Sequence, residues 1–134
     1  LVCDMTRSQD VKKLVETLKK EERHEYKFHT RVMRPWGSAT TILENTNYRI
    51  RMLEIQPGKS LSLQSHQQRS EHWVVLEGTA DVQRGDEKVI LQENESAYIP
   101  KGMRHRLGNS GNTTLQIIEV QQGEYLGDDD IERF

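Results

Sequence analysis

The chain has little cysteine, no long apolar run and almost no net charge. Its 134 residues include a single cysteine, Cys3, which excludes an internal disulfide and makes a reducing cytoplasm the expected location. No stretch is long and apolar enough for a signal peptide or a membrane span, so no membrane partner is expected. The formal net charge is only -2 although 30% of the residues are charged, which argues against a nucleic-acid partner. An anionic ligand must therefore be bound by a local cluster.

The first part of the chain differs in pattern from the rest. Ser8 is a predicted N-cap, and an apolar stripe at helical spacing follows it, formed by Val11, Leu14, Val15 and Leu18. We expect residues 1–31 to form a linker helix and residues 32–134 to form one folded domain. The stripe must pack on this domain, on a neighbouring domain or on a second chain, unless the helix is simply solvated. Together with the apolar residues of the tail, it favours a homodimer.

From residue 32 onward, short alternating segments are separated by turn residues. Strands are predicted at residues 38–44, 48–56, 61–66, 71–77, 80–83, 88–92, 97–99, 105–107 and 114–121. No helical pattern lies between them, which predicts an all-β sandwich or barrel of the jelly-roll type. Core and sheet packing is expected from Val74, Val75, Val89, Ile90, Ile99, Leu115, Ile117, Ile118 and Val120. The tail is expected to pack its apolar residues on the barrel or on a partner, with residues 128–130 as a solvated turn.

The stretch PGKSLSLQSHQQRSEHWVVLEG, residues 57–78, gathers potential metal ligands. Gln64 and His66 are two residues apart, so a strand directs both to the same face. Glu71 follows a short polar turn, and His105 follows a second turn further along the chain. Imidazole, carboxylate and amide groups suit a divalent ion such as Zn, Mn or Fe. We expect these four residues to bind one metal with a position left open for substrate or water; the alternative is that they are surface and turn residues.

Two motifs of the chain resemble those of the cupin superfamily. The spacing of the first motif is kept by Gly58, Gln64, His66, Glu71 and Gly78, with Gln64 in place of the first histidine. The second motif is matched by Pro100, Gly102, His105 and Asn109, with Asn94 in place of its opening glycine. The resemblance implies a double-stranded β-helix, the jelly-roll barrel of the cupins, preceded here by an N-terminal helix.

Longer segments resemble the type II mannose-6-phosphate isomerase family, namely RPWG, LSLQSH, RSEHW, EGTADVQRGDE, YIPKGMRHRL and IEVQQGEYLGDDDIERF. That family forms the C-terminal part of bifunctional mannose-1-phosphate guanylyltransferase/mannose-6-phosphate isomerase enzymes. The resemblance implies an excised C-terminal domain, an upstream nucleotidyltransferase domain as its partner, and a parent chain that makes GDP-mannose. Gln-x-His is usual in the family, which supports Gln64 as a ligand. Many members have three consecutive histidines where this chain has His66, Gln67 and Gln68.

The implied activity is the interconversion of mannose 6-phosphate and fructose 6-phosphate through an enediol, with Zn as the expected metal and Mn or Co as alternatives. Arg69, Lys101 and Arg106 are the candidate partners of the substrate phosphate, because they are basic and lie near the ligands in sequence. The catalytic base is not identified. His72 is the nearest titratable candidate, but alternation from Glu71 points it away from the metal.

Two other functions compete with the isomerase. A non-catalytic cupin could sense a sugar phosphate or dimerise the upstream guanylyltransferase, and the activity of the isolated domain distinguishes it from an isomerase. A metal-dependent oxygenase is disfavoured by Gln64 and by the family resemblance.

Overall fold

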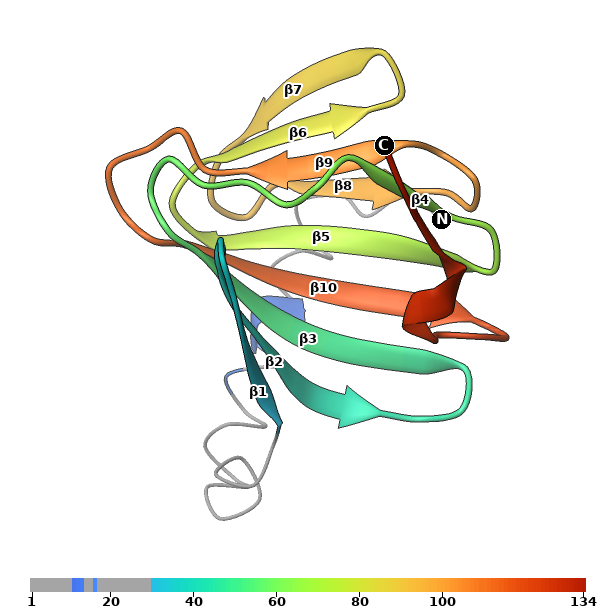
Figure 1. Cartoon of the computed structure of the whole chain (residues 1–134). Helices are drawn as coiled ribbons and strands as arrows, with labels where there is room; N and C mark the ends of the chain where they lie inside the picture. Colours follow the sequence, from blue (N-terminus) through green and yellow to red (C-terminus); the bar gives the residue numbers. More distant parts are fainter. Residues whose placement is uncertain (1–10, 14–15, 17–29) are drawn as a thin grey trace.

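The fold is described from a computed structural model, which describes residues 11–13, 16 and 30–134. In this part of the chain two antiparallel sheets are stacked against each other (Figure 1). The six-stranded sheet contains, in spatial order, β1 (Arg31–Arg34), β2 (Gly37–Glu44), β3 (Tyr48–Ile55), β10 (Leu115–Gly123), β5 (Arg69–Glu77) and β8 (Ser96–Ile99). The five-stranded sheet contains β11 (Ile131–Arg133), β4 (Gln64–His66), β9 (His105–Gly108), β6 (Ala80–Arg84) and β7 (Glu87–Leu91).

The order of the strands shows that the chain crosses repeatedly between the sheets. Strand β10 pairs with β3 on one side and with β5 on the other, although neither is its neighbour in sequence. The all-β jelly-roll architecture predicted from the alternating pattern is therefore confirmed for the described residues. Strands β1 and β11 each form one edge of their sheet, with β8 and β7 at the opposite edges, and β11 pairs with β4.

The space between the sheets holds the main core because alternate residues of each strand point inward. Its fully buried members include Leu53, Val75, Leu107, Leu115 and Ile117. A second apolar cluster lies on the opposite face of the six-stranded sheet and contains Ile42, Met52, Val74 and Ile118. One predicted core residue is wrong: the side chain of Ile90 is 63% exposed, because β7 is the outermost strand of its sheet and turns this position to solvent.

The strand limits differ from the prediction at both ends of the barrel. The segment at residues 61–66 is shorter than predicted, since only Gln64–His66 forms β4. Strands β1 and β11 are not predicted from the sequence, because four and three residues are too few for a clear alternating pattern. The tail joins the barrel by pairing β11 with β4, but two of its apolar residues, Tyr125 and Phe134, are exposed. Residues 128–130 form a single 3-10 turn before β11.

The N-terminal helix is described only in part. Residues 11–13 and 16 are helical, and Val11 packs against the second apolar cluster. The remaining predicted stripe residues, Leu14, Val15 and Leu18, lie outside the described residues, so the helix as a whole stays a prediction. No helix in the described part of the chain is long and apolar enough to cross a membrane.

Candidate metal centre

A cavity of about 350 Å³ lies between the sheets, where charged and polar side chains stand among the apolar ones of the inner faces. Its wall includes Gln64, Glu71, Trp73, His105 and Glu119. These residues come from four different strands of both sheets, β4, β5, β9 and β10. A larger hollow of about 610 Å³ lies beside β6, β7 and β9, but none of the four predicted metal ligands lines it. The polar cavity is therefore the candidate site.

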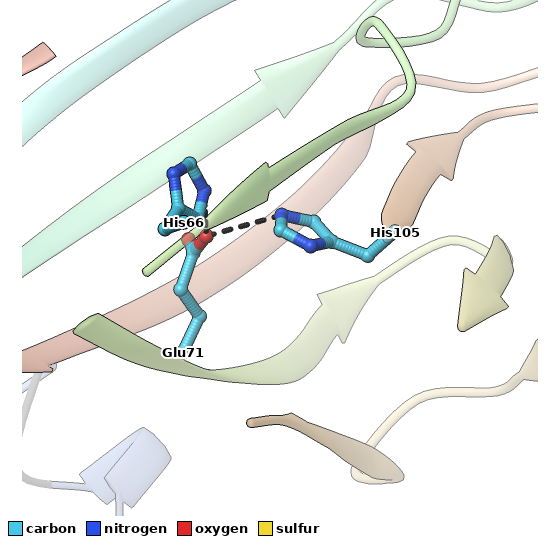
Figure 2. Close-up of side chains that lie close together, drawn as sticks. All are labelled: His66, Glu71 and His105. Carbon is cyan, nitrogen blue, oxygen red and sulfur yellow. Dashed lines mark ion pairs between the residues drawn. The ribbon is translucent and has the colours of Figure 1, made fainter. Parts of the chain in front are cut away.

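The structure brings His66, Glu71 and His105 together at this place (Figure 2). One potential ligand atom from each lies within 4.8 Å of the others, and all three side chains are buried. Oε1 of Glu71 is 2.7 Å from Nε2 of His66 and 3.2 Å from Nε2 of His105. Two imidazole nitrogens and one carboxylate oxygen thus converge on one point from three strands.

These donors fit a divalent ion. Nδ1 of His105 lies 2.9 Å from the carbonyl oxygen of Met103 and donates its proton there, so Nε2 is the nitrogen that faces the cluster and would bind a metal once it has lost its proton. Nδ1 of His66 is buried and has no hydrogen-bond partner among the described residues. The set of two neutral imidazoles and one carboxylate is one that catalytic zinc sites use, with the remaining position open.

Gln64 lies beside this cluster. It pairs with His105 across β4 and β9, and its side chain lines the same cavity. Its amide nitrogen is 3.5 Å from the carbonyl oxygen of Ser62 and 3.4 Å from the hydroxyl of the same residue, so its amide oxygen is directed elsewhere. The side chain could supply a fourth ligand through that oxygen. His72 is on the opposite face of β5, where its ring contacts that of Tyr98 at 4.6 Å.

Next to the cluster of His66, Glu71 and His105 lies a buried polar network that sequence reasoning missed. On β10, Glu119 lies opposite Trp73 of β5 on one side and opposite Arg51 of β3 on the other. Two residues further along β10, Gln121 lies opposite Glu71 of β5. The indole Nε1 of Trp73 donates to Oε2 of Glu119 at 3.2 Å, and Nε2 of Gln121 donates to Oε2 of Glu71 at 3.5 Å. A signal was present, because Glu119 and Gln121 alternate in phase with the buried Ile117.

The network shifts the pKa values of the acids in opposite directions. Burial alone would raise the pKa of Glu71, but hydrogen bonds with Glu119, His105 and His66 hold it well below its usual range. Burial raises the pKa of Glu119 to about 7, and the charge of Glu71 adds to this effect while that of Arg51 opposes it. Burial lowers the pKa of His105, but the hydrogen bond and charge of Glu71 outweigh it and raise the pKa overall. Near neutral pH, Glu71 is therefore ionised.

The three predicted phosphate partners do not lie together. Arg69 is buried and lines the cavity, where its guanidinium donates to the carbonyl oxygen of Leu126 at 3.2 Å and lies 3.4 Å from Nε2 of His66. Arg106 is exposed and lines both the cavity and the larger hollow. Lys101 lines a different hollow beside residues 83–86. The structure therefore brings Arg69 and Arg106 to the cavity and not Lys101.

The fold and the site define the class of the protein. A protein from Klebsiella pneumoniae with a double-stranded β-helix domain has a similar fold, with a TM-score of 0.68 and 20% identity, over 82% of this chain and 86% of that one. The chain thus has the double-stranded β-helix fold, and side chains that could bind a metal come from strands of both sheets.

The sequence comparison then gives the family. Residues 21–134 match the family described as mannose-6-phosphate isomerase C-terminal, and the chain belongs to it. It is 48% identical over its whole length to the xanthan biosynthesis protein XanB of Xanthomonas campestris pv. campestris (strain B100), of which it covers 29%. It is 47% identical over 99% of its length to the mannose-1-phosphate guanylyltransferase RfbM of Salmonella typhimurium, of which it covers 28%. The chain thus spans less than a third of these relatives.

Proposed function

We propose that this domain is a metal-dependent isomerase that interconverts mannose 6-phosphate and fructose 6-phosphate. The observation that carries the proposal is the convergence of His66, Glu71 and His105, two of which, Glu71 and His105, line a cavity that also contains arginines, in a chain of this family. We further propose that the parent chain contains an upstream guanylyltransferase domain that makes GDP-mannose, as the names of the longer relatives suggest.

The metal is proposed to be Zn, with Mn or Co as alternatives, held by His66, Glu71 and His105, with Gln64 as the weakest ligand. When bound, it would polarise the sugar oxygens and stabilise negative charge that develops on them. Glu71 supplies the one full negative charge of the ligand set, since its low pKa keeps it ionised. Gln121 donates to the other carboxylate oxygen of Glu71, so that Oε1 is the atom directed at the histidines.

The reaction moves one proton between neighbouring carbons. A base takes the proton from C2 of the aldose while the carbonyl oxygen at C1 is protonated, which gives the enediol; the hydroxyl at C2 then becomes the carbonyl and C1 receives a proton. The group that carries this proton must reach the cavity. Among the described residues, the carboxylates that do so are those of Glu71, Glu119 and Asp128, whereas His72 lies on the other face of its sheet.

A homodimer belongs to the same proposal. The second apolar cluster is already buried within one chain, whereas Met33 on β1 and Leu43 on β2 are 67% and 41% exposed. These two residues at an edge of the six-stranded sheet are available to a second copy. Light scattering at micromolar concentration measures the oligomeric state, and a monomer that is unchanged by Met33→Ser and Leu43→Ser would count against the dimer.

The activity is tested with metal-loaded protein and mannose 6-phosphate in D₂O. We expect formation of fructose 6-phosphate and incorporation of deuterium from solvent, because the transferred proton exchanges while it is held by the base. Proton NMR follows both events in one sample. Glu71→Gln is the control, since it keeps the shape of the ligand but removes its charge. Binding of the sugar phosphate without exchange or turnover would favour the non-catalytic cupin, with Gln67 and Gln68 as the first positions to restore to histidine.

A further inference from the structure

The cavity reaches two edge strands, β1 and β11, and each of them contributes one exposed arginine to its wall. Arg34 ends β1, at one edge of the six-stranded sheet, and Arg133 ends β11, at one edge of the five-stranded sheet. Both line the cavity that contains Glu71 and His105. In sequence they are almost a hundred residues apart, and neither lies in a metal-ligand motif. Only the pairing of β1 and β11 onto their sheets brings them to one cavity.

These two guanidinium groups differ from those of Arg51 and Arg69 in having no partner among the described residues. Arg51 is bound to Glu119, with its Nη2 2.6 Å from the carboxylate oxygen, and Arg69 donates to the carbonyl oxygen of Leu126. The side chains of Arg34 and Arg133 make no hydrogen bond or ion pair with another residue that the structure describes. Both are exposed at the open side. Two unpaired cations at the mouth of a cavity favour an anionic ligand.

The position of Arg133 is held from both sides of β11. After it, the backbone N–H of Phe134 donates to the carbonyl oxygen of Leu63 at 2.9 Å, and the guanidinium of Arg104 lies 3.8 Å from the centre of the Phe134 ring. Before it, the carboxylate of Asp130 accepts hydrogen bonds from the backbone N–H groups of residues 67 and 68, at 3.3 and 2.9 Å. Arg133 itself pairs with Gln64, next to the metal ligands. These contacts fix residues 130–134 of the tail beside the candidate metal site.

We infer that Arg34 and Arg133 form the subsite that binds the phosphate group of the substrate. The inference rests on the proposed function, in which the substrate is a hexose 6-phosphate. Its reacting carbons, C1 and C2, lie at the opposite end of the molecule from the phosphate. When C1 and C2 are at Glu71 and His105, the phosphate points to the open side, where the two arginines can bind its oxygens with paired N–H groups.

The subsite is tested by the variants Arg133→Gln and Arg34→Gln in the metal-loaded chain. Each removes a charged hydrogen-bonding group, so we expect KM for mannose 6-phosphate to rise about tenfold or more, with kcat changed much less and metal content unchanged. Arg133→Lys should restore part of the affinity, because it returns the charge without the planar fork. Arg31→Gln is the matched control, since Arg31 lies on β1 but outside the cavity and is 3.9 Å from Glu54. Unchanged KM in both cavity variants would overturn the subsite while leaving the isomerase intact.

Binding measurements separate this inference from the proposed function. Isothermal titration of the wild type with mannose 6-phosphate, mannose and inorganic phosphate shows whether the phosphate contributes to affinity. If the wild type binds the sugar phosphate but does not turn it over, the isomerase proposal is wrong. In that case weaker binding by Arg133→Gln supports the subsite, and unchanged binding overturns it. Lys101→Gln is measured in parallel, and a larger loss there than in Arg133→Gln would overturn the subsite. No preference for mannose 6-phosphate over mannose would also overturn it.

Discussion

Arg51 and Glu119 face each other on the neighbouring strands β3 and β10, with Nη2 of the arginine 2.6 Å from Oε1 of the glutamate. Nε of Arg51 donates to the same oxygen at 2.8 Å, and the indole of Trp73 donates to the other one. This carboxyl group is buried beside Glu71, and burial is the main reason why its pKa is raised to about 7. At neutral pH the metal-free site thus contains an ionised Glu71 beside a Glu119 that is only partly ionised.

The stability of the metal-free protein should therefore fall as pH rises through neutrality. The folded pKa of Glu119 is above its unfolded value, so its contribution is fully present below about pH 4.5 and is lost as pH rises through about 7. The raised pKa of His105 acts in the same direction above its unfolded value of 6.5. Glu71 has a lowered pKa, so its contribution is lost only on acidification below 4.5.

This pH dependence is measured as thermal unfolding in chelator between pH 5 and pH 8. Glu119→Gln cannot titrate, so its unfolding free energy should decline less over this range, by up to about 3 kcal/mol for a shift of this size. His72→Gln on the outer face serves as the control and should follow the wild type. Parallel curves for the wild type and Glu119→Gln would contradict the raised pKa.

Removal of a ligand should remove the metal. We expect one divalent ion per chain in the wild type, and a loss of affinity of about a hundredfold or more in His66→Ala and His105→Ala, because each deletes one of three converging donors. Gln64→Ala should weaken binding by a smaller factor. Elemental analysis of protein purified without chelator gives the stoichiometry. His72→Ala is the control and should retain the ion. Full metal occupancy in both histidine variants would contradict the assignment of His66 and His105 as ligands.

Asn109 should be essential for the stability of the loop between β9 and β10. It is buried, its amide nitrogen donates to the carbonyl oxygens of Ile55 and Thr113 at 2.8 Å each, and its oxygen accepts from the N–H of Gly111 at 2.9 Å. Asn109→Ala leaves these backbone groups unpaired, so we expect a loss of about 3 kcal/mol in unfolding free energy. Urea denaturation measures it against the exposed Asn112→Ala, and equal midpoints for the two variants would be the contrary result.

Gly37 should tolerate no side chain. Its φ is +150°, and a Cβ atom there would lie 1.8 Å from the backbone oxygen of Glu54 on β3. Because β2 cannot move away from β3 without breaking the sheet, Gly37→Ala should cost about 3 kcal/mol or more and reduce soluble yield. Gly85→Asn is the comparison: this turn residue has φ +60°, which asparagine adopts readily, and its Cβ direction is open. Similar melting temperatures for the two variants would contradict this prediction, because they would show that β2 and β3 can separate enough to admit a Cβ atom at position 37.

The residues of the candidate site could be found from the two cupin-like motifs, because each motif is a short stretch of sequence with a fixed spacing. Gln64 and His66 alternate within one strand, and Glu71 and His105 each follow a turn close to the start of their own strand. A resemblance to the family then supplied the fold and the expected activity. The same local alternation, counted from Glu71, is sufficient to assign His72 to the opposite face of its strand.

Strand alternation and turn residues were sufficient to predict the all-β class and most of the strands, and the sequence motifs singled out the three side chains that the structure brings together, His66, Glu71 and His105. Only the tertiary structure decided which remote residues share the cavity with them. Arg51 and Glu119 are 68 residues apart, and Arg133 reaches the site because a three-residue strand pairs with β4. Alternation sets which residues of a strand share a face, but the register between strands depends on long-range pairing and packing. For that reason Lys101, close to His105 in sequence, lies in another hollow, while Arg34 and Arg133 line the cavity.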